Sequence, residues 1–294
     1  MDRLQPVLFL GYKFCLRLLA WLPLYKFRLT STTHNFFLSK LKPTSVRIND
    51  CHLYLDSKDS LRLSTNPSNF LFHARIIGDY IAPGVTALDI GAHIGLYSTC
   101  LSRLVGKSGK VYAFEPNTQN FSLLKKNLKV NHCRNVIAVQ KAVSNTNGTT
   151  ALFLSSSSQA DHRIYQTDQA GSKEIVETIR IDDFLKKQVK IRFIKIDVQG
   201  AEFAVLQSMT KLLKKNKDIT LFLEYFPRCL SQYGIQPKTY IQLLTDLQFE
   251  LFDISDKEQK VYPTNTRKLS RRFTLKNGMM TNLLCIRKKK FKYV

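Results

Sequence analysis

The chain lacks the close-spaced cysteine pairs of structural zinc sites and of small disulfide-stabilised domains. Its six cysteines are scattered along 294 residues, from Cys15 to Cys285, and none forms a C-x-x-C pair. Zinc ligands come in close-spaced pairs and disulfide scaffolds are short and dense in cysteine, so neither class fits. We therefore expect reduced thiols and a cytoplasmic protein.

The chain also lacks an uncharged apolar run of the roughly 20 residues that cross a bilayer. Its most apolar stretch, residues 4–25, is interrupted by Lys13 and Arg17 and contains Pro23 near its end. As a helix, this stretch would have an apolar side and a basic side. Such a helix either lies in a membrane surface or packs on the domain or on a second copy. A signal peptide fits less well, because the basic n-region is thin and no cleavage site follows.

Acidic residues are scarce at both ends of the chain. Residues 1–48 hold eight Lys or Arg and a single acid, Asp2, and residues 267–294 hold ten Lys or Arg and no acid. These ends account for +17 of the net charge of +23. We predict a basic amphipathic extension over residues 1–48 and one folded domain over residues 49–294. Basic ends favour an anionic partner, which can be a lipid headgroup layer such as the inner face of a membrane, a nucleic acid or an acidic protein. Solubility alone is an equally good explanation.

The middle of the chain alternates β-rich runs with helical ones. We predict strands over residues 85–90, 110–114, 136–143, 191–198, 219–225, 249–254 and 282–286. Helices are predicted over residues 95–104, 117–130, 201–213 and 237–247, with Asn117 as an N-cap. This order indicates an α/β fold, a doubly wound and mostly parallel sheet with helices on both faces.

The alternation breaks between the third and fourth strands. Residues 151–154 and 177–181 resemble additional strands around a very polar stretch, SSSSQADHRIYQTDQAGSKE. That stretch is too polar for a core and too long for a simple turn. We expect it to form a mobile loop or lid.

The most specific local pattern is ALDIGAHIGLYS, residues 87–98. Asp89 ends a strand, Gly91 allows a tight turn, and Gly95 lets the next helix begin close to the sheet. The spacing is not G-x-G-x-x-G, and no G-x-x-x-x-G-K-[ST] loop occurs anywhere in the chain. The turn therefore predicts a nucleotide ligand without a pyrophosphate.

Glu115 ends the second strand, about 20 residues beyond the glycine turn. A carboxylate in this position can accept hydrogen bonds from both hydroxyls of a ribose. The alternative is an acid that only caps the helix beginning after Pro116 and Asn117.

Together these motifs resemble the class I methyltransferases, and in particular the FkbM family. LDIGAHIGLYS is similar to the family's first motif, and AFEPNTQNFSLLKKNLKVN to its second strand and helix. KIDVQGAEFAVL, residues 195–206, resembles the K-x-D-x-E-G-x-E signature, with Gln199 where the family usually has Glu. FLEYFP, residues 222–227, is a fourth similar segment, and the core motifs span residues 85–255.

The resemblance implies a Rossmann-like methyltransferase with a seven-stranded sheet and S-adenosylmethionine as its cofactor. It implies transfer of a methyl group to a hydroxyl of a sugar, glycolipid or small natural product, and hence a small-molecule, glycan or lipid-linked acceptor. An RNA-modifying methyltransferase using the basic ends, and a non-catalytic module that keeps the cofactor pocket, are the alternatives. No RNA-binding module is recognisable, so a nucleic-acid partner is not expected. The expected cofactor residues are Asp89, Gly91, His93, Gly95, Glu115 and Asp197.

Asp197 is the leading catalytic candidate, because it ends the fourth strand at the edge where open α/β sheets bind ligands. It can orient the acceptor hydroxyl, accept its proton or face the sulfonium; otherwise it is a turn acid bonded to backbone N–H groups. Glu224 is a second candidate near the acceptor. Glu202 opens the next helix, where the helix dipole alone favours an acid. His162 in the polar stretch is a candidate base that lid closure would bring in.

No metal cluster is expected. Asp197 could ligate Mg²⁺, but the DVQGAE segment lacks acidic companions in the right pattern. The turn after the fourth strand also lacks the Asn/Asp-Pro-Pro-aromatic sequence of amino-directed DNA and protein methyltransferases. Metal-independent chemistry on oxygen is therefore favoured.

Overall fold

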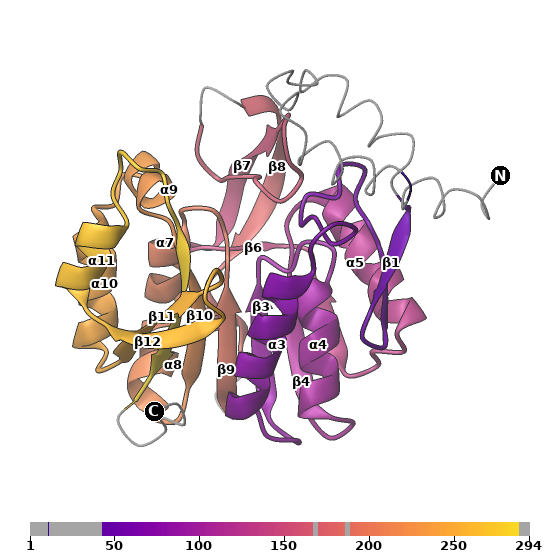
Figure 1. The fold of residues 1–294 in the computed structure, drawn as a ribbon, viewed down its shortest axis with the longest axis horizontal. Helices are drawn as coiled ribbons and strands as arrows, with labels where there is room; N and C mark the ends of the chain where they lie inside the picture. Colours follow the sequence, from indigo (N-terminus) through magenta and orange to yellow (C-terminus); the bar gives the residue numbers. More distant parts are fainter. Residues whose placement is uncertain (1–10, 12–42, 167–169, 186–188, 288–294) are drawn as a thin grey trace.

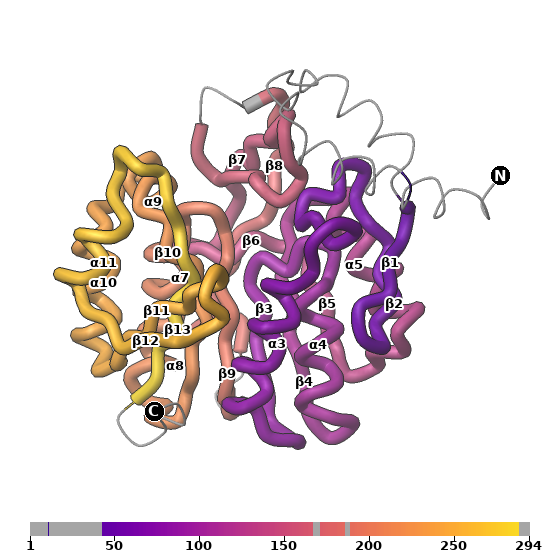
Figure 2. The backbone as a smooth tube through the Cα atoms, in the orientation of Figure 1, coloured from indigo at the N-terminus to yellow at the C-terminus, as the bar shows by residue number. Residues whose placement is uncertain are grey.

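A computed structural model describes residue 11 and residues 43–166, 170–185 and 189–287 of the chain. Its central sheet has eight strands in the order β12-β11-β13-β10-β9-β3-β4-β5 (Figures 1 and 2). Five neighbouring strands are parallel: β10 (Thr220–Tyr225), β9 (Ile191–Ile196), β3 (Thr86–Ile90), β4 (Lys110–Phe114) and β5 (Val136–Val139). The predicted doubly wound α/β fold is confirmed.

The other three strands are joined by antiparallel pairing. β13 (Thr281–Ile286) lies between β10 and β11 (Glu250–Ser255), and β12 (Lys260–Thr264) pairs with β11 at the edge. The sequence predicted seven strands, so β12 is an addition to the expected count. Its sequence, KVYPT, contains Pro263, which weakens a strand pattern and is tolerated at a sheet edge.

Helices cover both faces of the sheet, because neighbouring residues of each buried strand point to opposite sides. On one face, Phe193 and Phe222 pack with α3 (Ser68–Tyr80) and α4 (Leu96–Val105), beside α5 (Thr118–Val130). On the other face, Ile194 and Leu223 pack with α7 (Glu202–Ser208), α8 (Thr210–Lys215) and α10 (Pro237–Asp246). The smaller helices are α6 (Ile181–Phe184), α9 (Pro227–Gln232) and α11 (Thr266–Arg272).

The predicted third strand, residues 136–143, is divided between two sheets. Its second part forms β6 (Ala142–Val143), which pairs with β8 (Ala170–Ile179), and β8 pairs with β7 (Gly148–Ser155). The two additional strands are therefore confirmed and are longer than expected. They form a separate hairpin beside the carboxyl edge of the main sheet, visible at the top of Figure 1.

The predicted lid includes residues 156–166, which are held against the domain in this structure. The backbone N–H of Gln159 donates to Ser60 Oγ at 2.8 Å, and its carbonyl accepts from Asn120 at 3.0 Å. Tyr165 donates to the carbonyl of Gln199 at 2.9 Å. Residues 156–166 are thus held by hydrogen bonds at Gln159 and Tyr165, and several of them line the pocket.

The predicted helix over residues 4–25 lies outside the described residues, apart from Gly11. Beyond it, β1 (Ser45–Ile48) and β2 (Cys51–Tyr54) form a hairpin that spans the predicted domain boundary at residues 48 and 49. Asn127 of α5 bonds the backbone of Tyr54 in both directions, at 2.7 and 3.0 Å. In the described part of the chain, no helix has both the length and the apolarity to cross a bilayer.

Candidate functional site

The turn after β3 brings the carboxyl ends of two neighbouring strands into close contact. Gly91 has a φ of +78°, and a Cβ at this position would lie 1.8 Å from the carbonyl oxygen of Asp197. The N–H of Asp197 in turn donates to the carbonyl of Ile90 at 3.0 Å. Only glycine fits here. Because it has no side chain, the predicted cofactor turn can lie directly against the backbone of the predicted catalytic acid, Asp197.

Gly95, at the start of α4, lies against a side chain rather than against the backbone. Its φ is +89°, and a Cβ would lie 2.7 Å from Cδ1 of Leu124 on α5. The glycine therefore lets α4 begin close against α5, whereas the sequence predicted a close approach to the sheet. It is not among the residues that line the pocket.

Asp89 is fully buried behind the pocket and does not line it. Its Oδ2 accepts a hydrogen bond from Ser98, and its Oδ1 lies 3.5 Å from Nζ of Lys195. The predicted direct contact with cofactor therefore has no support in this geometry. Asp89 holds α4 and Lys195 in place instead.

Glu115 lines the pocket and also braces two turns. One carboxylate oxygen accepts from the N–H of His93 and the other from the N–H of Asn117, each at 2.9 Å. Burial raises the pKa of Glu115 to about 7 despite these hydrogen bonds. With a further side-chain hydrogen bond from Asn120, three of the roughly four acceptor positions of the carboxylate are used, so one remains for a ribose hydroxyl. The two predicted roles of Glu115, binding a ribose and capping the helix that follows, are therefore compatible.

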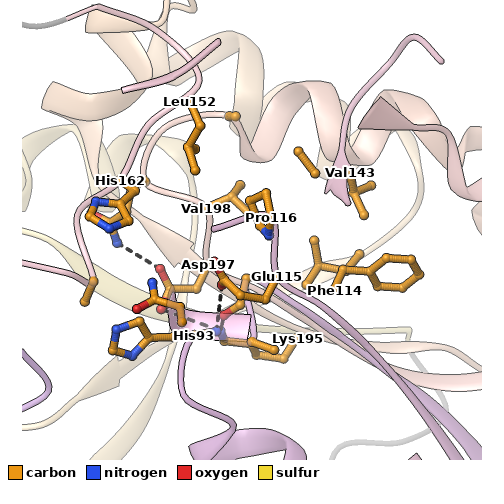
Figure 3. Close-up of a pocket in the computed structure, with 18 of the residues that line it drawn as sticks. His93, Phe114, Glu115, Pro116, Val143, Leu152, His162, Lys195, Asp197 and Val198 are labelled. Atoms are coloured by element: carbon orange, nitrogen blue, oxygen red, sulfur yellow. Dashed lines mark hydrogen bonds and ion pairs between the residues drawn. The ribbon is translucent and has the colours of Figure 1, made fainter. Parts of the chain in front are cut away.

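The pocket comprises about 830 Å³ of space when its open mouth is included. It has two chemically different sides (Figure 3). His93, His162 and Asp197 gather on one side, and the apolar Phe114 and Val143 lie on the other. An apolar slot suits a flat ring system, and the polar side suits a hydroxyl or a charged group.

Lys195 lies beneath the polar side and was not predicted as a site residue. It is 3% exposed, donates to the carbonyl of Gly91 at 2.8 Å, and lies 3.7 Å from Oδ2 of Asp197. Burial disfavours its charge, but the carboxylates of Asp197, Asp89 and Glu224 more than compensate, and the pKa of Lys195 is raised. A lysine inside the apolar strand IRFIKI was the available sequence signal.

Tyr97 is a second pocket residue that the sequence analysis missed. Its ring lies 5.1 Å from Nζ of Lys195, and its hydroxyl is 2.7 Å from Nδ1 of His73. His73 in turn bonds Asp256 through Nε2 at 2.6 Å. This chain of contacts fixes the aromatic wall against which Lys195 packs.

Gln199 connects the two candidate carboxylates Asp197 and Glu224. Its Nε2 donates to Oδ1 of Asp197 at 2.8 Å and lies 3.1 Å from Oε2 of Glu224. Gln199 adopts a φ of +55°, unusual for a residue with a side chain, which directs the amide between the two acids. Burial, then the charges of Asp197 and Glu202, raise the pKa of Glu224 well above its ordinary value. Glu224 itself does not line the pocket.

Glu202 has a structural position. It is 1% exposed, absent from the pocket wall, and accepts from the backbone N–H groups of Val198 and Gly200 at 3.0 to 3.1 Å. Burial raises the pKa of Glu202 to about 7. The catalytic role considered for Glu202 therefore has no geometric support, because its carboxylate is used to hold the Asp197 turn.

The two histidines of the pocket offer different hydrogen-bonding groups. Neither ring nitrogen of His93 has a hydrogen-bond partner among the described residues, and burial lowers its pKa to about 4. His93 is therefore neutral at physiological pH. His162 accepts the N–H of Ser155 at Nδ1, 3.1 Å away, which leaves Nε2–H as a donor. In this arrangement His162 can donate to a ligand but cannot act as the predicted base.

The described residues contain no group of three or more His, Cys, Asp or Glu side chains arranged to hold a metal ion. They do fit S-adenosylmethionine on three structural grounds. The glycine at position 91 leaves the turn without a Cβ, and Glu115 keeps an acceptor position at the pocket wall. The ring nitrogens of His93, also in the pocket wall, have no hydrogen-bond partner among the described residues.

Solved methyltransferase structures share this topology only loosely. A SAM-dependent methyltransferase from Aquifex aeolicus is 15% identical, with 76% of this chain and 91% of that chain covered and a TM-score of 0.41. An rRNA methylase from Streptococcus thermophilus is 12% identical, with 74% and 96% covered and a TM-score of 0.44. Fibrillarin from Aeropyrum pernix, in complex with S-adenosyl-L-methionine, is 11% identical, with 74% of each chain covered and a TM-score of 0.42.

The Methyltransferase FkbM domain matches residues 89–251, which is more than half of the chain. The match begins at the glycine turn and includes Glu115, Lys195, Asp197 and Glu224. The chain therefore belongs to the FkbM family and is an S-adenosylmethionine-dependent methyltransferase.

Proposed function

We propose that the enzyme methylates a hydroxyl oxygen of a sugar, a glycolipid or a small natural product. The observation that carries this proposal is the setting of Asp197 at the polar side of the pocket. Its side chain is about one-third exposed, and both carboxylate oxygens have fixed neighbours, Gln199 at 2.8 Å and Lys195 at 3.7 Å. A held but accessible carboxylate can orient a hydroxyl and accept its proton.

When bound, S-adenosylmethionine supplies an electrophilic methyl group on a sulfonium. The residues of this chain would provide the rest: Glu115 and the Gly91 turn would hold the cofactor, and Phe114 and Val143 would keep water from the apolar side of its site. Asp197 would orient the acceptor hydroxyl and accept its proton. The neutral His93 and the Nε2–H of His162 can bond to the acceptor's other oxygens.

The apolar and histidine-lined pocket favours a neutral, hydroxyl-rich acceptor over a nucleic acid. Two lysines belong to the described pocket wall. Lys195 is engaged by Gly91, Asp89 and Asp197, and Lys141 is paired with Glu177. Both are therefore already neutralised by groups of this chain rather than by an acceptor phosphate.

The test uses S-adenosylmethionine labelled with ¹³C in its methyl group and a panel of free sugars, glycolipids, phenols and short RNAs. We expect mass spectrometry and NMR to find a new O-methyl signal with a hydroxyl acceptor. Asp197→Asn should lower turnover about 10²- to 10⁴-fold while retaining cofactor binding, as for loss of a general base. Asp246→Asn, on the exposed side of α10, is the matched control and should retain full turnover.

Labelled nitrogen or carbon, or RNA as the methylated acceptor, would contradict the proposal. Full activity of Asp197→Asn would leave methyl transfer intact but refute the role given to this carboxylate.

A further inference from the structure

A second surface of the molecule combines positive charge with exposed apolar side chains. It consists of α11 and the loop that precedes β13, residues 265–280, which we name the basic loop surface. Leu275, Met279 and Met280 on this loop are 49%, 47% and 53% exposed. Large apolar side chains that cluster in the solvent on one loop usually indicate an interaction site.

The loop is held in shape by one side chain. Oδ1 of Asn277 accepts from the N–H groups of Thr274 and Met279, at 3.1 and 3.0 Å, and its Nδ2 donates to the carbonyl of Arg272 at 2.9 Å. The N–H of Asn277 also donates to the hydroxyl of Thr274 at 3.2 Å. These hydrogen bonds fix the turn with its apolar side chains outward, so their exposure is built into the loop.

The charge of this surface has a single sign. Residues 265–280 contain five Lys or Arg and no acid. Arg272 is paired with Asp253 at 2.6 Å. The exposed Arg267, Arg271 and Lys276 have no ion pair among the residues that the structure describes.

The basic loop surface lies at the same edge of the sheet as the pocket. Thr281, directly after the loop, pairs with Tyr225 at the carboxyl end of β10. Gly278 is close to the guanidinium of Arg228 on α9, and the carbonyl of Cys229, also on α9, lies against Gly200. Figures 1 and 2 show the yellow loop rising beside α9 on the side of the molecule that carries β7 and β8. One helix therefore separates this surface from the Asp197 turn.

We propose that the basic loop surface binds the surface of an anionic lipid bilayer. Cations attract the headgroups, and exposed Leu and Met side chains enter the boundary with the acyl chains. A nucleic acid would also be attracted by the cations, but its phosphate backbone would not contact the three exposed apolar side chains favourably. A second copy of the same surface would place like charges opposite one another. An enzyme bound in this way has its pocket edge near the membrane, within reach of a lipid-linked acceptor.

The experiment follows hydrogen–deuterium exchange in the full chain with vesicles of phosphatidylcholine alone or with about one-third phosphatidylglycerol. We expect residues 265–280 to be protected by the anionic vesicles and unaffected by the neutral ones. Because exchange is read locally, binding through other parts of the chain does not produce this signal. The measurement needs neither cofactor nor acceptor, so it can fail or succeed independently of the proposed function.

Two triple variants with the same change of net charge separate this surface from general electrostatics. Arg267→Glu, Arg271→Glu and Lys276→Glu together should weaken vesicle binding in a sedimentation assay by roughly a hundredfold, at about fivefold per cation. The control reverses three exposed lysines of α8, Lys211, Lys214 and Lys215, and should bind nearly as the parent does.

A third variant, Leu275→Ser with Met279→Ser and Met280→Ser, tests the apolar contribution and should also lose protection at the loop. Unprotected residues 265–280 in a vesicle-bound chain, or equal losses in the two charge variants, would overturn the proposal. It would also be overturned if single-stranded RNA, or raised protein concentration without vesicles, protected the loop in place of lipid.

Discussion

Replacement of Gly91 by alanine should damage cofactor binding more than any nearby change of equal size. The added Cβ would lie 1.8 Å from the carbonyl oxygen of Asp197 and 2.9 Å from its carbonyl carbon, both of them backbone atoms. A left-handed φ of +78° adds strain of about 1–2 kcal/mol for any residue with a Cβ. Forced displacement in a packed interior adds about 1–3 kcal/mol. The expected loss of unfolding free energy for Gly91→Ala is therefore about 2–5 kcal/mol.

Gly84→Ala is the matched control. Its φ of +85° carries the same strain, but the new Cβ would meet only Ser108 Oγ at an ordinary 3.5 Å. For Gly84→Ala we expect the free energy of unfolding to fall by about 1–2 kcal/mol and the affinity for the cofactor to stay unchanged. The stability loss of Gly95→Ala should lie between those of Gly84→Ala and Gly91→Ala. Its new Cβ would contact, at 2.7 Å, only the end of the flexible Leu124 side chain.

Urea unfolding measures the stability of the three variants, and calorimetry with S-adenosylmethionine measures their affinity. For Gly91→Ala we expect cofactor affinity to fall more than tenfold, because the displaced carbonyl belongs to a residue of the pocket wall. If this variant does not fold, the Gly95→Ala result still tests the ranking. Equal stability losses at Gly84 and Gly91 with unchanged affinity would refute the close approach of the two strand ends.

Three other substitutions test the charges of the pocket. Glu115→Gln places an N–H against a backbone N–H and should weaken S-adenosylmethionine binding about tenfold or more in calorimetry; unchanged affinity would remove Glu115 from the cofactor site. His93 has its pKa lowered to about 4, so between pH 4 and 6.5 the unfolded chain binds more protons and stability rises with pH. The stability advantage of the parent over His93→Gln should therefore grow by up to about 3 kcal/mol from pH 4 to 7 in urea titrations, and a constant difference would mean an ordinary pKa. At pH 8, Gln199→Glu should lower the free energy of unfolding by about 1–3 kcal/mol in urea titrations, and added Mg²⁺ should restore it. The control Gln207→Glu, at an exposed position, should show neither the loss nor the effect of Mg²⁺.

The sequence predicted those parts of the fold that depend on local pattern. Asn117 caps α5 as expected, with its side chain accepting the N–H of Asn120 at 3.0 Å. The buried run at residues 191–196 and the glycine turn also lie where the pattern placed them. In each case the signal and the structure involve neighbouring residues.

Features that depend on distant partners were not predictable in the same way. The β1–β2 hairpin has strands of only four residues and is stabilised by Asn127 and Asn131, more than 70 positions away. Asp89 and Glu202 lie near strand and helix ends as predicted, but their partners Ser98, Lys195, Val198 and Gly200 hold both carboxylates behind the pocket wall. Lys195 and its partner Gly91 are 104 positions apart, so only the fold reveals why a lysine is stable inside that strand.

Gln199 connects the partly exposed Asp197 of the pocket wall to the buried Glu224 behind it. Both acids accept from one amide nitrogen, at 2.8 and 3.1 Å, and the raised pKa of Glu224 favours its protonated form. A glutamate at position 199 would replace the shared donor with a third carboxylate, and like charges this close cannot all remain ionised. Carboxylate oxygens are also ligands of Mg²⁺ and Ca²⁺, so the added charge would favour binding of a divalent cation. Calorimetric binding of Mg²⁺ by Gln199→Glu but not by the parent would support this account. Equal Mg²⁺ binding by both would show that the amide does not take the place of a cation.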